Sequence, residues 1–191
     1  NTAVIVQLPL PVQMQPDYLV NAVPPEKDAD VLSSRAIGDF TMGRGVLVPP
    51  IVGAIEYILA SANVDVAGKN VVVLGAGRLV GRPTSLWLTK NQSVYTMIGK
   101  ESADMAERLT HADIVISGVG KPGLITSAML KKGAVVIDAG TAESHGKVVG
   151  DVDPAGIEDV VGLYTPVPGG VGPLTVAMLF RNLIALTEQK K

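Results

Sequence analysis

Val71-Val72-Val73-Leu74-Gly75-Ala76-Gly77-Arg78-Leu79-Val80-Gly81 is the stretch of this chain that predicts its fold. Its four consecutive apolar residues are typical of a short strand that is buried on both faces of a sheet. The glycines predict a tight turn, and residues 81–89 predict a helix directly after it. This order brings backbone N–H groups and the positive end of a helix to one point, which favours a bound pyrophosphate.

The alternation of strands and helices continues along the chain. Further strands are predicted at residues 93–98, 113–117 and 134–138, helices at 103–109 and 127–130, an edge segment near 160–163 and a last helix from 174 to about 189. Because strands that alternate with helices form parallel βαβ units, the sequence predicts an α/β fold with a Rossmann-type, doubly wound parallel sheet.

The sequence before the glycine turn is less regular. Residues 1–8 are interpreted as a short buried strand, and residues 17–21 as one or two helical turns. Residues 26–48 show no clean period and are expected to form a loop with at most a short strand. The pair Pro49-Pro50 then opens a helix that ends near residues 61–63, in which apolar positions follow the 3.6-residue repeat.

Composition excludes several classes of protein. Of 191 residues, 47% are hydrophobic and 18% are charged, so the chain can bury a core and is not disordered. Its net charge of −2 provides no electrostatic footprint for nucleic acid or for an anionic membrane. The absence of cysteine excludes disulfides and thiolate sites, and no metal site is predicted. The uncharged run at residues 160–180 is broken by prolines and glycines, so it is not a membrane helix.

Small residues gather where the predicted strands end. Ligands of open α/β sheets bind at the carboxyl ends of the strands, so the turn at 75–81 is expected to hold a dinucleotide. Residues 117–123 and 138–141 lie at the same edge and leave room for a nicotinamide ribose, although either can also be a plain turn. The most distinctive segment is Thr165-Pro166-Val167-Pro168-Gly169-Gly170-Val171-Gly172-Pro173-Leu174-Thr175, which contains more prolines and glycines than the start of a helix requires.

The choice of dinucleotide depends on the end of the second strand. NAD sites place a carboxylate there for the ribose hydroxyls, and this chain has Gly99, Lys100 and Glu101. Lys100, together with Arg78 and Arg82 near the turn, can hold a 2′-phosphate, but each can equally be a solvated surface charge. These residues favour NADP over NAD by a small margin.

Five motifs occur in a fixed order: Val6-Gln7-Leu8-Pro9-Leu10-Pro11, Lys27-Asp28-Ala29-Asp30, Val119-Gly120-Lys121-Pro122, Gly150-Asp151-Val152 and the segment 165–175. In this order they resemble the methylenetetrahydrofolate dehydrogenase/cyclohydrolase family, over residues 4 to about 185. The resemblance implies a cleft in which a tetrahydrofolate derivative lies beside the nicotinamide. It also implies oxidation of 5,10-methylenetetrahydrofolate with NAD(P)+ and hydrolysis of the methenyl product to 10-formyltetrahydrofolate, in a cytoplasmic homodimer.

The resemblance assigns roles to individual residues. Gln7 would hydrogen-bond a catalytic lysine, and Asp30 would accept hydrogen bonds from the pterin ring, although without the family they read as a strand-end amide and a solvated loop acid. The implied folate contacts are Gln7, Leu8, Pro9, Asp30, Gly169 and Gly170. The implied dinucleotide contacts are Gly75, Ala76, Gly77, Arg78, Leu79, Val80, Gly81, Gly99, Lys100, Gly118, Val119, Gly120, Thr141, Gly172 and Thr175.

The chain also departs from the family pattern. The usual Gly-Arg-Ser turn is Gly75-Ala76-Gly77, and the usual serine after the second strand is Gly99, which leaves the choice of NADP or NAD open. In the family a Tyr-x-x-x-Lys pair carries the catalytic lysine. No tyrosine of this chain has a lysine four residues later, so that lysine is expected to precede Asn1.

We therefore expect a chain that is incomplete at its N-terminus and inactive alone. Residues 1–48 would be the remnant of a second α/β domain, the catalytic domain. Residues 49–168 would be the NAD(P)-binding domain, and residues 169–191 the cleft loop and a return helix. Two other classes stay open: a non-catalytic dinucleotide-binding module and a shikimate-type Rossmann dehydrogenase. The Pro-Gly-Gly-Val-Gly-Pro string argues against the dehydrogenase of the shikimate type.

Overall fold

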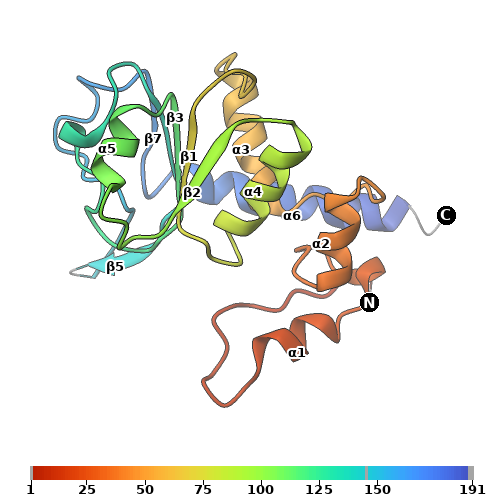
Figure 1. The fold of residues 1–191 in the computed structure, drawn as a ribbon. Coiled ribbons are helices and arrows are strands. Elements are labelled where there is room, and N and C mark those ends of the chain that lie inside the picture. Colours follow the sequence, from red (N-terminus) through yellow and green to blue (C-terminus); the bar gives the residue numbers. More distant parts are fainter. Residues whose placement is uncertain (1, 145, 189–191) are drawn as a thin grey trace.

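The computed structural model describes residues 2–144 and 146–188. Its central sheet has five parallel strands in the order β2-β1-β3-β4-β7 (Figure 1). The strands are β1 (Val71–Leu74), β2 (Tyr95–Ile98), β3 (Ile114–Ser117), β4 (Val135–Asp138) and β7 (Leu163–Thr165). Strands β1 and β3 are neighbours although β2 separates them in the chain, so the direction of winding reverses between them. Open α/β sheets bind ligands outside such a reversal point.

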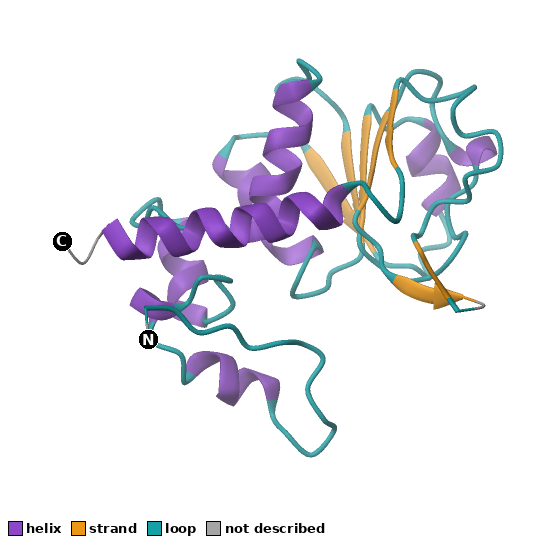
Figure 2. Cartoon of the chain, turned by 180° about the vertical axis from the view of Figure 1, so that it is seen from behind, coloured by secondary structure: helices purple, strands orange, loops and turns teal. Residues whose placement is uncertain are grey.

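Helices cover both faces of the sheet, which explains why every residue of β1 is apolar and buried (Figure 2). Successive strand residues point to opposite faces, so Val71 and Val73 pack in one core while Val72 and Leu74 pack in the other. The first face is covered by α3 (Pro50–Ser61), α4 (Gly81–Lys90) and α6 (Val171–Glu188), and the second by α5 (Met105–Thr110) and η2 (Ser127–Met129). The predicted doubly wound fold is confirmed.

Residues 2–48 form a smaller unit beside the C-terminal half of α6 (Figures 1 and 2). It contains α1 (Pro16–Asn21), η1 (Pro25–Lys27) and α2 (Ser34–Thr41). Asn182 of α6 is 4% exposed and joins this unit to the rest of the chain. Its Nδ2 donates to the carbonyl oxygens of Ala29 and Val48, at 2.8 and 2.7 Å. We call residues 2–48 the N-terminal segment.

Two expectations for the N-terminal segment are wrong. Residues 1–8 were expected to form a buried strand, but the described part has only an isolated bridge between Val4 and Asp28, and Val4 is exposed. A strand needs a continuous hydrogen-bonded neighbour, and among the described residues 2–8 strand pairing is limited to that bridge, where the N–H of Val4 donates to Lys27 O at 2.8 Å. Residues 26–48 were expected to be a loop, but they contain α2. Ser33 is the N-cap of that helix, since its side-chain oxygen accepts a hydrogen bond from Ala36 N at 3.2 Å.

Smaller differences concern the C-terminal half of the chain. The edge strand is β7, a few residues later than the segment expected near 160–163, and α6 begins at Val171 instead of residue 174. Pro173 is nevertheless in the first turn of α6, where a proline needs no hydrogen-bond partner. A hairpin of β5 (Ala142–Ser144) and β6 (Lys147–Val149) follows β4 and was not expected.

Candidate functional site

A cavity of about 690 Å³ lies between the carboxyl ends of the strands and the N-terminal segment. We call it the cleft. It is lined by residues of the N-terminal segment, the glycine turn, the loop after β4, and the segment from Pro166 to Val176. The expected site residues that line it are Asp30, Arg78, Leu79, Val80, Thr141, Gly169, Gly170, Gly172 and Thr175. Residues far apart in the sequence therefore share one cavity, which includes the turn after β1, one of the two strands between which the winding of the sheet reverses.

The glycine turn brings the start of α4 very close to the end of β1. A Cβ atom at position 81 would lie 1.9 Å from the carbonyl oxygen of Gly75, so only glycine fits there. The turn is held by its neighbours, because Gly75 N donates to Ile98 O at 2.8 Å and Gly118 N donates to Leu74 O at 3.0 Å. The ends of β2 and β3 thus flank the turn, and Gly99 and Lys100 follow directly after β2.

A buried carboxylate holds the loop that follows β3. Asp151 is fully buried, and its Oδ2 accepts from Ser117 Oγ at 2.6 Å and from Val119 N at 2.8 Å. Its Oδ1 accepts from Lys121 N at 2.8 Å. Three donors on one side chain determine the path of residues 117–121, the loop expected to contact the dinucleotide.

A second buried carboxylate holds the loop that follows β4. Asp138 accepts hydrogen bonds from Gly140 N at 2.9 Å, Asp151 N at 3.1 Å and Val152 N at 2.9 Å. Burial raises the pKa of Asp138, and repulsion by the Asp151 carboxylate adds to this, while the three backbone N–H groups oppose it. A Cβ at position 140 would lie 2.3 Å from the carboxyl carbon of Asp151, so glycine is needed for the two loops to approach.

Sequence reasoning did not find this carboxylate pair. Asp138 was noted only as a strand end, and Asp151 only as part of a family motif. The available signal was an acid within two residues of a glycine at the end of an apolar run, where a solvated acid would be unusual. Asp138 and Asp151 together connect the loops after β3, β4 and β6 by hydrogen bonds.

Two further acids lie close together in the N-terminal segment but differ in environment. Asp28 is 3% exposed and accepts from the N–H groups of Leu32 and Ser33, at 3.2 and 2.8 Å. Asp30 lines the cleft, and among the described residues no hydrogen-bond donor reaches its carboxyl group. Burial, with a smaller contribution from the charge of Asp28, raises the pKa of Asp30 to about 6. Asp30 is therefore a free carboxyl group that faces an apolar cavity and can accept N–H donors of a ligand.

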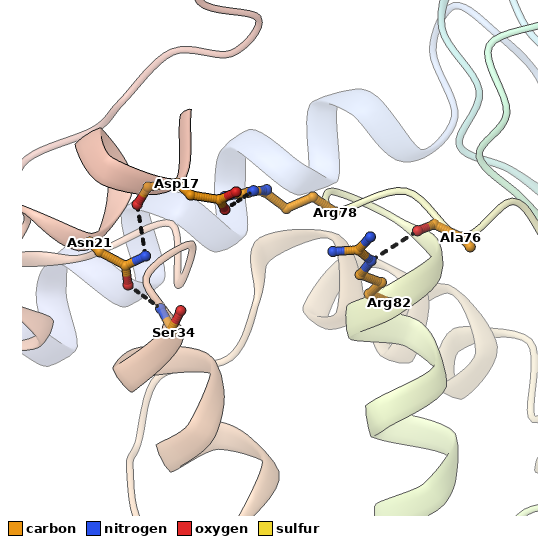
Figure 3. Close-up of polar contacts among 6 residues, drawn as sticks. All are labelled: Asp17, Asn21, Ser34, Ala76, Arg78 and Arg82. Atoms are coloured by element: carbon orange, nitrogen blue, oxygen red, sulfur yellow. Dashed lines mark hydrogen bonds and ion pairs between the residues drawn. The ribbon is translucent and has the colours of Figure 1, made fainter. Parts of the chain in front are cut away.

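Three charged side chains, Asp17, Arg78 and Arg82, line one part of the cleft, which we call its mouth (Figure 3). Arg78 of the glycine turn forms an ion pair with Asp17 of α1. Arg82, in the first turn of α4, donates from Nε to the carbonyl oxygen of Ala76 at 3.1 Å. Both arginines line the cleft, which makes this end of the cavity suited to an anion.

Three expected folate contacts lie elsewhere. Gln7, Leu8 and Pro9 are not among the residues that line the cleft, and Gln7 is exposed, with its Nε2 donating to Leu8 O at 2.9 Å.

Across residues 2–144 and 146–188, no helix has the length and apolarity needed to span a bilayer. Over the same residues, no three acidic or histidine side chains converge on a point where a metal ion could bind.

Comparisons with known proteins agree with this geometry. A family model described as the NAD(P)-binding domain of tetrahydrofolate dehydrogenase/cyclohydrolase matches residues 49–191. The bifunctional protein FolD of Staphylococcus aureus (strain Newman) is 42% identical over 192 residues, which cover 100% of this chain and 67% of that protein.

Two solved structures are similar over nearly the whole chain. The methylenetetrahydrofolate dehydrogenase-cyclohydrolase of Trypanosoma brucei, complexed with NADP cofactor and inhibitor, superposes with a TM-score of 0.93 at 34% identity. The match covers 99% of this chain and 67% of that one. The Campylobacter jejuni enzyme gives a TM-score of 0.94 at 31% identity and covers 100% and 68%. This chain therefore spans about two thirds of the length of each relative.

Proposed function

Because the chain belongs to the tetrahydrofolate dehydrogenase/cyclohydrolase family, we propose that its cleft binds NADP beside a tetrahydrofolate derivative. The reaction is the oxidation of 5,10-methylenetetrahydrofolate to the methenyl form, followed by hydrolysis to 10-formyltetrahydrofolate. The observation that carries the proposal is the convergence of the glycine turn, Asp30 and the segment after β7 on one cavity at the carboxyl ends of the strands. Family membership leaves no reason to retain the shikimate-type alternative.

The residues present fit a dinucleotide. A Cβ placed at Gly99 or Gly172 would meet no atom within 4 Å, so these positions leave open space where a ribose or a flat ring can lie. The Trypanosoma brucei relative was solved with NADP. The positive charges of Arg78, Arg82 and Lys100, and the absence of an acid directly after β2, support NADP over NAD for this chain.

The bound nicotinamide would supply the hydride acceptor, and the described residues would position the reactants. Asp151 and Asp138 hold the loops after β3 and β4 in one arrangement, and these loops would contact the nicotinamide ribose of a bound dinucleotide. The prolines and glycines of the segment 165–175 shape the wall at the junction of the two ligands. Above pH 6 the Asp30 carboxylate is ionised and accepts hydrogen bonds from the pterin ring N–H groups. The role of Gln7, Leu8 and Pro9 in folate binding stays a prediction.

Turnover by these 191 residues is a separate question. No lysine is among the described residues that line the cleft. We infer that the chain alone binds the dinucleotide but does not move the protons that both reactions require. The carboxylates among the described lining residues are Asp17, Asp30 and Asp138. Asp17 is paired with Arg78, and Asp138 is held by three backbone N–H groups.

Calorimetric titration and a rate assay test the two parts of the proposal. NADP+ is titrated into the 191-residue chain, and NADPH formation is followed after 5,10-methylenetetrahydrofolate is added, with a full-length relative as the positive control. We expect saturable binding of NADP+ and no turnover above the uncatalysed rate. Absence of dinucleotide binding would contradict the proposed site, and robust turnover would contradict the inference about proton transfer.

A further inference from the structure

The two arginines at the mouth of the cleft differ in their partners. Arg78 donates from Nη2 to Oδ1 of Asp17 (Figure 3). Arg82 donates from Nε to Ala76, and among the described residues no acidic side chain pairs with its Nη groups. The charge of Arg78 is thus partly neutralised, whereas the charge of Arg82 is available to an anion.

The Asp17 carboxylate is presented from an anchored backbone. Asn21 Nδ2 donates to the carbonyl oxygen of Asp17 at 2.7 Å, and Asn21 Oδ1 accepts from Ser34 N at 2.8 Å (Figure 3). These bonds connect α1 to the start of α2. The carboxylate therefore reaches the glycine turn from a defined position and not from a free loop.

The Asp17–Arg78 pair joins the two walls of the cleft. The other ion pairs among the described residues lie outside the N-terminal segment, and they join Arg108 to Asp104 and Lys131 to Asp113. The side chain of Asp17 is 81% exposed and that of Arg78 is 29% exposed. An ion pair with one highly exposed partner contributes little in water, so Arg78 can exchange this partner for a stronger one.

We propose that Asp17 competes with a phosphate group of the dinucleotide for Arg78. This inference rests on the proposed function, because it concerns the same dinucleotide site. A phosphate accepts two parallel hydrogen bonds from a guanidinium group, and a 2′-phosphate also carries more charge than a carboxylate, so the phosphate displaces Asp17 from Arg78. The same exchange breaks the contact between α1 and the glycine turn. Arg82 binds the phosphate without such an exchange, because it has no carboxylate to release.

The test is the affinity of Asp17→Asn for NADP+ and for NAD+, measured by calorimetry on the 191-residue chain at low ionic strength. Because Arg78 is then free before the ligand arrives, we expect dissociation constants about two- to fivefold lower than in the unsubstituted chain. A gain with NADP+ alone supports exchange with the 2′-phosphate, and an equal gain with both supports exchange with the pyrophosphate. An unchanged or weaker affinity for both dinucleotides overturns the proposal.

The same substitution in an Arg78→Gln variant separates the exchange from a general charge effect. Removal of any nearby acid raises the affinity for an anionic ligand, because it removes a repulsive charge. In Arg78→Gln, the further change Asp17→Asn should leave the affinity unchanged, and a gain that persists there overturns the proposal. Asp104→Asn is the matched control, because it removes an exposed acid from an ion pair outside the cleft. If the unsubstituted chain binds neither dinucleotide, that result contradicts the proposed function. A result against the exchange at Arg78 is instead a chain that binds a dinucleotide but gains no affinity from Asp17→Asn.

Discussion

Replacement of Asp151 by asparagine should weaken both the fold and the dinucleotide site. The carboxylate accepts three hydrogen bonds, and an amide has only one oxygen to replace its two. If the amide oxygen stays with Ser117 and Val119, the NH₂ group faces the N–H of Lys121, so two donors meet in a buried place. The reverse orientation leaves Ser117 and Val119 opposite the NH₂ group.

The magnitude follows from the lost bonds. One charge-assisted hydrogen bond contributes about 1.5–3 kcal/mol, and an unsatisfied buried donor costs about 1–3 kcal/mol. Weaker repulsion of the Asp138 carboxylate offsets part of this loss. We expect a decrease of about 3 kcal/mol in the free energy of unfolding and, for a chain of this size, a decrease of about 6–12 °C in Tm. Because the loop at 117–121 loses its fixed path, the affinity for NADP+ should fall about tenfold or more.

Urea denaturation and calorimetric titration of NADP+ measure the two effects. Asp153→Asn is the matched control two residues away, because its single hydrogen bond within the described part of the chain comes from Ala155 N at 3.0 Å, in a turn that asparagine forms equally well. The control should stay within about 0.5 kcal/mol of the unsubstituted chain. If Asp151→Asn is as stable as the control and binds NADP+ equally well, the carboxylate does not position the loop.

Three further substitutions test the site and the fold. Asp30→Asn should stabilise the chain by about 1–2 kcal/mol at pH 7. The folded-state pKa of Asp30 is raised to about 6, so the unsubstituted chain loses stability as the pH rises from 4 through 6 and this carboxyl group ionises. Urea titrations at pH 4 and 7 should therefore show a higher free energy of unfolding for Asp30→Asn only at pH 7. Gly81→Ala should unfold the glycine turn or abolish NADP+ binding, because its Cβ would lie 1.9 Å from Gly75 O, whereas Gly99→Ala should leave Tm unchanged. Asn182→Ala should lower the free energy of unfolding by about 2–4 kcal/mol, because two carbonyl groups lose their donor, and an equal urea midpoint would contradict this.

Local sequence pattern determined most elements around the parallel sheet, but not the hairpin of β5 and β6. The apolar runs at 71–74, 114–116 and 135–137 each predicted a strand that the structure contains, because burial on both faces requires apolar residues in succession. The glycine turn and the helix after it were likewise predictable, since both depend on residues a few positions apart. Pattern failed at α2, whose start depends on the Ser33 cap and whose packing depends on α4.

The partners of the charged side chains were decided by the tertiary structure alone. Asp138 reaches the N–H groups of Asp151 and Val152 only because the hairpin brings the end of β6 back to β4. Asp17 reaches Arg78 only because α6 holds the N-terminal segment across the ends of the strands. A sequence shows which residues carry charge, and periodicity shows which face they occupy. Which donor lies within 3 Å of a carboxylate depends on loops that meet in space from distant positions, so that information exists only in the folded chain.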